Sequence, residues 1–284
     1  VTHTSYGIME GIIMNVRNAV QKYRYSLILL KELVRSDFKL RYQGSVLGYV
    51  WSLLKPLFLF VILYFVFVEV FKVSGGMPNW AVGMLIGIVL WNFFSEITNL
   101  GLGSVVGRGD VLRKVNFPKY IVVLSTSVSA LINLGFNMLI IGVFMAISGV
   151  DLSWSALLTP LYILEIFLFG LGLAFILSPL FVRFRDINFV WEIIMQGMFY
   201  ASIVIYPVSM VLERKPGLAQ FMLLNPVAQA IQDVRHVLVS PQYPTLHTIH
   251  GGWLSLVPYA IVVMTLIVGA WYFKRRSPHF AEEI

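Results

Sequence analysis

The chain has no cysteine and few charged residues, and both shortages narrow what it can be. Without cysteine there are no disulfides, no thiolate metal ligands and no cysteine nucleophile. Charged residues make up 12% of the 284 residues, whereas a soluble domain carries roughly 25%. No Gly-Lys dipeptide occurs anywhere in the chain. The chain therefore lacks a Walker A loop, and with it the phosphate cradle of a P-loop ATPase.

Hydrophobic residues make up 58% of the chain and gather in long runs. The mean hydropathy of +0.81 places most of the chain in lipid. Six runs are each long enough to cross about 30 Å of hydrocarbon as a helix. The sequence therefore predicts an all-α integral membrane protein whose transmembrane domain covers 52–273. The six predicted spans are 52–71, 80–104, 120–147, 156–182, 190–212 and 253–273.

Basic residues indicate the orientation of these spans. Most of the 21 Lys and Arg residues lie in the N-terminal region 1–51, in the loops after the second and fourth predicted spans, and in the tail 274–284. Because basic loops stay on the cytoplasmic side, we expect both termini in the cytoplasm. The net charge of +7 then reflects topology rather than nucleic-acid binding.

A helix is predicted within the N-terminal region, over about 24–42. Apolar residues recur there at helical spacing, while basic residues occupy another face. The two sets are Leu27, Leu30, Val34 and Phe38, and Lys31, Arg35 and Lys39. We expect an amphipathic helix along the cytoplasmic interface. The pattern leaves open whether it only anchors to anionic headgroups or also contacts a substrate or a partner.

The segment 213–252 is too polar to span the membrane and too long for a plain loop. Asn225-Pro226 is typical of a helix start, because proline is favoured at the first helical position. Four apolar residues then share one face, namely Val227, Ile231, Val234 and Leu238. We predict a short helix at about 226–239 that dips back against the bundle on the outer side.

The cytoplasmic loop from Asp110 to Lys119 combines apolar residues with charge. Apolar side chains exposed within a charged rim favour docking into a groove on another protein. The alternative is that they fold back onto the bundle. The residues predicted for this docking loop are Asp110, Leu112, Arg113, Lys114, Phe117 and Pro118, and Arg183, Arg185 and Asp186 belong to the second cytoplasmic loop.

Aromatic residues are dense in the first and fifth predicted spans. Aromatic rings stack on sugar rings and Tyr hydroxyls bond to sugar hydroxyls, although bulk facing lipid or the interface explains such residues equally well. In the first span, Tyr64 shares a helical face with Phe60 and Phe67. In the fifth, Phe199 and Tyr206 are seven residues apart and share a face as well. We predict that these faces meet across a conduit. Its candidate residues are Phe60, Tyr64, Phe67, Phe199, Tyr200 and Tyr206.

The glycines, glutamates and histidines within or near the spans are explained by packing and exposure without a specific function. Gly83 and Gly87 have the GxxxG spacing of close helix packing. Glutamates within or near spans are expected mainly at interfaces, with a proton relay as the alternative. His247 and His250 have no evident third ligand, so no metal site is expected.

Several motifs occur in an order that matches a known family. The longest runs from Arg35 to Leu57 and reads RSDFKLRYQGSVLGYVWSLLKPL, and the next, from Leu112 to Pro118, reads LRKVNFP. Arg185-Asp186-Ile187, Tyr206-Pro207-Val208-Ser209 and Asn225-Pro226 follow. Over nearly its whole length the chain resembles the permease subunit of ABC-2-type polysaccharide exporters. That family exports O-antigen, teichoic acid and related cell-wall glycans.

The resemblance implies a homodimer in a bacterial cytoplasmic (inner) membrane, bound to two copies of an ATPase subunit. ATP and Mg would be bound by that partner, and this chain would be neither an enzyme nor a carrier of a cofactor. The loop from Arg113 to Pro118 would couple the two subunits. The segment with Asn225, Pro226 and Arg235 would gate the exit, and the aromatic first and fifth spans would line the path.

The substrate implied by the resemblance is a polymer carried on polyprenyl pyrophosphate. Pyrophosphate is strongly anionic, and arginine binds such groups with two parallel hydrogen bonds. Arg35, Lys39 and Arg41 precede the first span on the cytoplasmic side. We therefore predict that these three residues contact the headgroup.

Two other classes of function compete with this interpretation. An ion-coupled lipid or lipid-linked-sugar flippase would use intramembrane carboxylates and need no ATPase. A membrane-embedded glycosyltransferase would need a carboxylate-rich catalytic loop, and no such pair of aspartates occurs.

Overall fold

The computed structural model describes residues 24–39, 44–48, 50–72, 76–114 and 117–283. Throughout these ranges every regular element is a helix, as the sequence predicts. Among the described residues, five helices are long and apolar enough to cross a membrane. They correspond to the first four predicted spans and to the sixth. Their bounds are Val50–Phe67, Trp80–Ser104, Tyr120–Ile147, Trp154–Arg183 and Trp253–His279.

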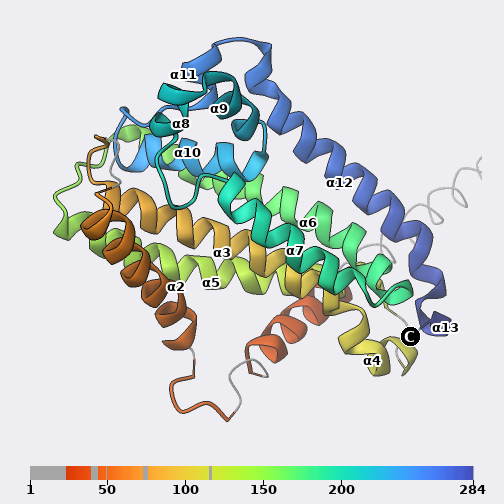
Figure 1. Cartoon of the computed structure of the whole chain (residues 1–284). Coiled ribbons are helices and arrows are strands. Elements are labelled where there is room, and N and C mark those ends of the chain that lie inside the picture. The colour runs from red at the N-terminus through yellow and green to blue at the C-terminus, as the bar shows by residue number, and fades with distance from the viewer. Residues whose placement is uncertain (1–23, 40–43, 49, 73–75, 115–116, 284) are drawn as a thin grey trace, which may run out of the picture.

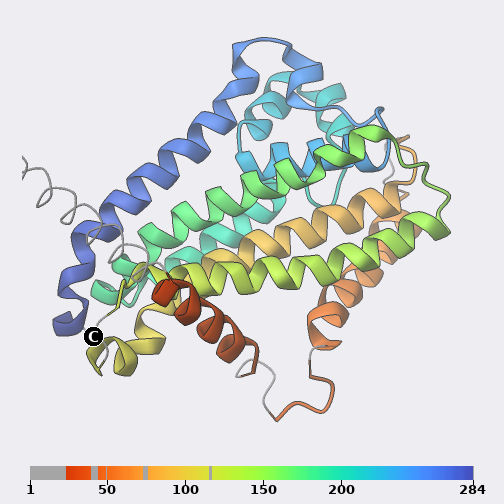
Figure 2. The same ribbon diagram turned by 180° about the vertical axis from the view of Figure 1, so that it is seen from behind.

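Helix α3 (Trp80–Ser104) forms the centre of the bundle. It packs against α2 (Val50–Leu63), α5 (Tyr120–Ile147) and α6 (Thr159–Arg183). Figures 1 and 2 show α3, α5 and α6 side by side. In the most apolar part of α3 78% of residues are buried, against 11% in the first span and 17% in the last, which contains α12 (Val257–Arg276). The first and last spans therefore leave most of their apolar surface to lipid or to another protein.

The fifth predicted span, 190–212, is not one continuous helix. Helix α7 runs only over Ile187–Ala201, and α8 begins at Val208 after the connection 202–207. At 1.5 Å per residue, the 15 residues of α7 extend for about 22 Å, which is less than the ~30 Å of hydrocarbon. The expectation of a continuous helix over 190–212 is therefore wrong, and contacts described below account for the break.

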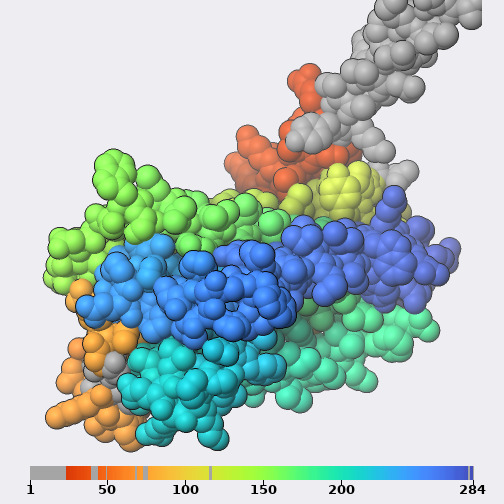
Figure 3. All heavy atoms as spheres, turned by 90° about the horizontal axis from the view of Figure 1, so that it is seen from above, coloured from red at the N-terminus to blue at the C-terminus, as the bar shows by residue number. Residues whose placement is uncertain are grey.

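Four short helices form a cap at one end of the bundle, over residues 208–250. Helix α10 is buried against α3 and α6, with the other three helices around it (Figure 1). Seen from above in Figure 3, α12 runs along this face in blue with the teal atoms of α8 and α9 beside its beginning. The cap helices are α8 (Val208–Arg214), α9 (Pro216–Leu223), α10 (Pro226–Leu238) and α11 (Leu246–His250). The helix predicted at about 226–239 is thus confirmed as α10.

The opposite end of the bundle carries short elements from the middle and the end of the chain. Helix α4 (Gly109–Lys114) follows the turn Val106–Arg108, and α13 (Phe280–Glu283) follows the turn Ser277–His279. Helices α4 and α13 contact each other, and they lie close together beside the C-terminus in Figure 1. We call this region the α4 end. The remaining short helices, Trp154–Leu158 and Trp253–Leu256, precede α6 and α12.

Candidate functional site

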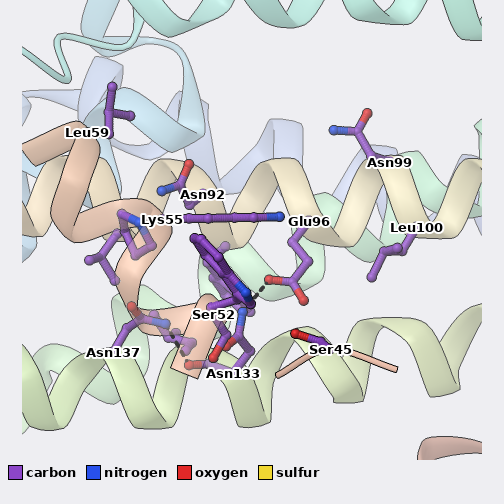
Figure 4. Close-up of a pocket in the computed structure, with 15 residues that line it drawn as sticks. Ser45, Ser52, Lys55, Leu59, Asn92, Glu96, Asn99, Leu100, Asn133 and Asn137 are labelled. Atoms are coloured by element: carbon purple, nitrogen blue, oxygen red, sulfur yellow. Dashed lines mark hydrogen bonds between the residues drawn. The ribbon is translucent and has the colours of Figure 1, made fainter. Parts of the chain in front are cut away.

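A pocket of about 740 Å³ lies between α2, α3 and α5. Its lining is unusually polar for a space between three apolar helices, because it includes four side-chain amides, an ammonium group, a carboxylate and two hydroxyls. Figure 4 shows most of these groups gathered between α3 and α5, while the Asn99 side chain points away from that space. The polar groups of the lining belong to Asn92, Asn99, Asn133, Asn137, Lys55, Glu96, Ser45 and Ser52. We call it the amide pocket.

Hydrogen bonds order the wall of the amide pocket between α3 and α5. The Asn133 Nδ2 donates to Glu96 Oε2 at 2.7 Å, and the Asn137 Nδ2 donates to the backbone oxygen of Asn133 at 2.9 Å. The Asn133 Oδ1 is buried and accepts no hydrogen bond. Polar side chains at the middle of membrane helices are costly, so they mark functional sites more often than structural ones. Glu96 is one of the glutamates within predicted spans, whereas no prediction from the sequence covers the asparagines around it.

Arg235 on α10 is fully buried and joins the cap to the bundle. Its guanidinium group donates hydrogen bonds of 2.6–2.9 Å to the backbone oxygens of Gly83, Ile203 and Val204 and to Gln232 Oε1. The Arg235 Cζ also lies 4.9 Å from the ring centroid of Trp80. Burial of a cation is tolerated because charge-assisted hydrogen bonds replace its water. We call this arrangement the Arg235 clamp.

The Arg235 clamp explains two features of α3 and α7. A Cβ atom at Gly87 would collide with the Arg235 guanidinium, and one at Gly83 would lie 2.7 Å from the Tyr243 hydroxyl oxygen. The GxxxG spacing therefore serves close packing within the chain, against the cap. In the connection after α7, Ile203 has a φ of 56°, in the left-handed region, and its carbonyl oxygen accepts a hydrogen bond from Arg235. The carbonyls of Ile203 and Val204 are bonded to Arg235 and not within a helix, and Pro207 has no backbone N–H with which to continue α7.

Asn225 serves both the start of α10 and the end of α7. Its Oδ1 accepts a hydrogen bond from the backbone N–H of Val227 at 3.0 Å, which caps the helix, and Pro226 occupies the first helical position. Its Nδ2 donates to Ser202 Oγ at 2.9 Å. The motif Asn225-Pro226 and the distant Arg235 thus hold the same connection. Their predicted role as an exit gate is a separate matter and stays a prediction.

The α4 end contains an apolar cluster that covers two residues of the predicted docking loop. Leu112 and Phe117 are each only 6% exposed, because they pack with residues from α6, α12 and α13. Phe280 of α13 is fully buried in this cluster, 5.4 Å from the ring of Phe273. Lys119 holds the tail in place by donating to the Ser277 backbone oxygen at 2.6 Å. The expectation that Leu112 and Phe117 are exposed is therefore wrong.

Other residues of the two predicted cytoplasmic loops remain exposed. Asp110, Arg113 and Lys114 of α4 are exposed, Val111 is 39% exposed, and Pro118 is half-buried. The second loop likewise exposes Arg183, Arg185 and Asp186 at the junction of α6 and α7. Both loops thus expose charged side chains at the same end of α6. Only their apolar residues differ from the prediction.

The N-terminal helix is described over 24–39, within the predicted 24–42. Arg35 and Lys39 are exposed, and Arg41 lies outside the described residues. The helix is tied to the bundle by an ion pair between Asp37 and Arg108. Arg108 also donates to Ser125 Oγ of α5 at 2.9 Å. This connection was not predicted, because its members are 71 residues apart in the sequence.

The predicted conduit aromatics divide into two groups. Phe60 is buried against Phe144 of α5, at a centroid distance of 5.7 Å, and Phe199 packs on Trp91 of α3, also at 5.7 Å. By contrast, Phe67 and Tyr206 line one pocket of about 380 Å³. The first span therefore does meet the residues after α7, but Phe199 and Tyr206 do not share a helical face, because α7 ends at Ala201.

The first span changes its helical form where two of these aromatics lie. Helix α2 contains Pro56 and continues as a π-helix over Tyr64–Val70, and wide turns of this kind are frequent at functional sites. Tyr64 is half-buried here. Tyr200 is 60% exposed on α7, and its carbonyl accepts a hydrogen bond from the Tyr206 hydroxyl at 2.6 Å.

A buried polar cluster joins the cap to α12. The Gln229 Nε2 donates to Asp233 Oδ2 at 2.7 Å and to the Tyr259 hydroxyl oxygen at 2.8 Å. Burial raises the pKa of Asp233 to about 6, although the hydrogen bond from Gln229 and the charges of His236 and His247 lower it. Within the described ranges, no group of three His, Asp or Glu side chains is placed to hold a metal ion.

Comparison with known proteins gives a consistent result. The model of the family described as ABC-2 type transporter matches residues 28–239. An O-antigen export system permease protein RfbA from Klebsiella pneumoniae is 31% identical over 132 residues, which are 46% of this chain and 50% of that protein. A protein of the same name from Myxococcus xanthus is 29% identical over 160 residues, 56% of this chain and 60% of that protein. The chain thus spans about half the length of the Klebsiella relative it matches.

Proposed function

Because the chain belongs to the ABC-2 type transporter family, we propose that it is the membrane subunit of an ATP-driven exporter of lipid-linked polysaccharide. The observation that carries the proposal is the family match over 28–239, together with relatives that are O-antigen export permeases. The substrate would be a glycan such as O-antigen, teichoic acid or cell-wall galactan on polyprenyl pyrophosphate. Energy would come from a separate ATPase subunit that binds ATP and Mg.

The proposed arrangement has six crossings of the bacterial cytoplasmic membrane, with both termini in the cytoplasm. Five crossings are the long apolar helices, and the fifth in order is α7 together with the connection 202–207. The basic residues of α4 and of the α6–α7 junction support placing the α4 end in the cytoplasm. The cap then lies on the outer side, with α10 dipping into the membrane as a re-entrant helix.

Two copies of the chain would form a conduit and bind two ATPase subunits. The largely unburied first and last spans support an assembly larger than one chain. The exposed charges Asp110, Arg113 and Lys114 would contact the ATPase, and Leu112 and Phe117 would pass its motion to the apolar cluster beneath them. The residues Arg183, Arg185 and Asp186 form a second contact beside the first.

The path of the substrate would begin at the N-terminal helix and end at the cap. Arg35, Lys39 and Arg41 would bind the pyrophosphate, since Arg35 and Lys39 are exposed beside the α4 end. Phe67 and Tyr206 are the aromatic pair best placed to contact the glycan, because they line a common pocket near the cap. Asn225, Pro226 and Arg235 would hold the gate that opens there.

The proposal is tested by purifying the tagged chain from its native membrane in mild detergent. We expect an ATPase subunit to co-purify in equal copy number, and lipid-linked polysaccharide to stimulate its ATP hydrolysis more than bare polyprenyl pyrophosphate does. A chain that purifies without any ATPase and still moves lipid down an ion gradient in liposomes would contradict the proposal.

A further inference from the structure

The amide pocket brings together polar groups from the middles of separate membrane helices. Asn92 stands near the centre of α3, and Asn133 and Asn137 near the centre of α5. Such placement is unfavourable in lipid, and although Asn133 joins α5 to Glu96 of α3, a space of about 740 Å³ remains open beside this bond. That volume lies within the range of about 300–1,000 Å³ for small-molecule sites. The pocket is therefore the right size for a bound group with many hydrogen-bonding atoms.

The charge of the pocket lining argues against an anionic occupant. Its ionisable side chains are Lys55 and Glu96, whose charges cancel. Figure 4 shows Lys55 extended along α3, on the same side of the pocket as Glu96. A pyrophosphate here would face the Glu96 carboxylate without a second cation. The lining instead suits an uncharged group.

The remaining lining is chemically suited to hydroxyl groups. Side-chain amides both donate and accept hydrogen bonds, and a sugar hydroxyl does the same. Asn92 lines the pocket and is half-buried, so its amide can meet such a hydroxyl, while the Asn133 Oδ1 lies buried in the wall without a hydrogen-bond partner. Trp51 lines the same pocket and offers an aromatic face on which a sugar ring can stack.

We propose that the amide pocket binds an uncharged sugar unit of the lipid-linked polysaccharide, separately from the basic residues that hold its pyrophosphate. This inference rests on the proposed function. The two sites divide recognition of one substrate: the exposed cations of the N-terminal helix contact the anionic headgroup, and the amides between α2, α3 and α5 contact the glycan. The pocket would then distinguish a loaded carrier lipid from an empty one.

The test uses the complex of the chain with its ATPase subunit in lipid nanodiscs. Two probes are compared, a polyprenyl pyrophosphate that carries a disaccharide and the same lipid without sugar. Asn92→Leu is a suitable variant, because Asn92 is half-buried, so the change should not disturb the helix core. Asn188→Leu on α7, outside the pocket, is the matched control.

We expect Asn92→Leu to raise the Kd of the disaccharide lipid at least tenfold while the Kd of the bare lipid changes less than twofold. Asn188→Leu should leave both values unchanged. If wild-type ATPase activity is stimulated by the disaccharide lipid but Asn92→Leu binds it normally, the pocket assignment falls and the proposed function stands. If the wild-type complex binds neither lipid, both fail.

A second measurement does not depend on the affinity of a substituted pocket. Since the chain has no cysteine, a single cysteine at position 92 or 133 can be labelled alone. We expect the disaccharide lipid to slow labelling by a small water-soluble maleimide at least fivefold at either position, and the bare lipid to have no such effect. Equal protection by both lipids would assign the pocket to the carrier chain and overturn the inference.

Discussion

The two ends of the bundle both contain apolar packing, but the cap is also held by a fully buried guanidinium group. At the cap, one buried guanidinium group bonds to four oxygens at 2.6–2.9 Å, and these belong to α3, to the connection after α7 and to α10 itself. At the α4 end, Leu112, Phe117 and Phe280 form an apolar cluster with α6 and α12. Hydrogen bonds from a planar guanidinium group fix the direction of the contact as well as its distance, whereas apolar contacts are non-directional.

This difference indicates which end is built to move. Apolar side chains can slide and repack at modest cost when the total volume is kept. A guanidinium that shifts within the Arg235 clamp leaves buried acceptors unsatisfied, at a cost of about 1–3 kcal/mol each. We therefore expect ATPase-driven motion to be absorbed first at the α4 end, with the cap following as a unit. The predictions below alter one end at a time.

The largest effect is expected from Arg235→Met. The substitution removes all donors of the Arg235 clamp and leaves the carbonyls of Ile203 and Val204 without a partner, at about 3 kcal/mol or more in total. Thermal unfolding in detergent should show a greatly lowered Tm. Arg235→Lys should recover only part of the loss, because an ammonium group has three donors and no planar fork. Wild-type stability in Arg235→Met would mean that apolar packing alone holds the cap.

At the α4 end, Phe280→Ala should cost about 3 kcal/mol, because it removes a fully buried ring from the apolar cluster. The loss should be local, so hydrogen exchange should quicken in α4 and α13 while α10 stays protected. Phe280→Leu, which keeps most of the volume, is the control and should lose less than half as much. Faster exchange spread equally over the cap would contradict the separation of the two ends.

A smaller change is expected for Asn225→Ala at the cap. It removes the N-cap bond to Val227 and the bond to Ser202, and loss of such a cap costs about 1 kcal/mol. Exchange should quicken in the first turn of α10 and at residues 202–207. Ser202→Ala should remove the bond from Asn225 while keeping the cap to Val227, so the two contributions can be separated. No change in either segment would show that Arg235 alone fixes the connection.

The smallest effect on stability is expected for Arg113→Glu on α4, because the side chain is exposed. We expect its Tm to stay within about 1 °C of wild type while association with the ATPase weakens at least fivefold. Lys274→Glu, at an exposed position on α12, controls for the change in total charge. Equal weakening by both substitutions would point to a general charge effect instead of a contact at α4.

Features fixed by local chemistry could be predicted, and those fixed by distant contacts could not. The start of α10 follows from Asn225-Pro226, and its buried face follows from Val227 and Ile231 at helical spacing. The break after α7 has one local signal, Pro207, which lacks the N–H needed to continue a helix. The positive φ of Ile203 has none, because Ile203 is not a glycine and its carbonyl oxygen is bound by a residue 32 positions away.

The α4 end and the amide pocket show the same limit. A charged loop that contains apolar residues predicts a docking surface. Leu112 and Phe117 are instead buried, because they pack in one cluster with Phe280, which lies at the far end of the chain. The amide pocket did have a signal, since Asn92, Asn133 and Asn137 interrupt the middles of two apolar runs. Which of these asparagines face a common space depends on how three helices pack together. The periodicity of residues within one helix does not contain that information.

The central claim is that this chain carries lipid-linked polysaccharide across a membrane with energy from a separate ATPase. The most direct measurement is transport in proteoliposomes that contain the complex, with the glycan of the translocated lipid detected by an impermeant glycosidase on the far side. We predict translocation that requires ATP, stops with a hydrolysis-dead ATPase, and is reduced in Arg113→Glu while that variant stays folded. Translocation that continues with the dead ATPase and follows an ion gradient would contradict the claim.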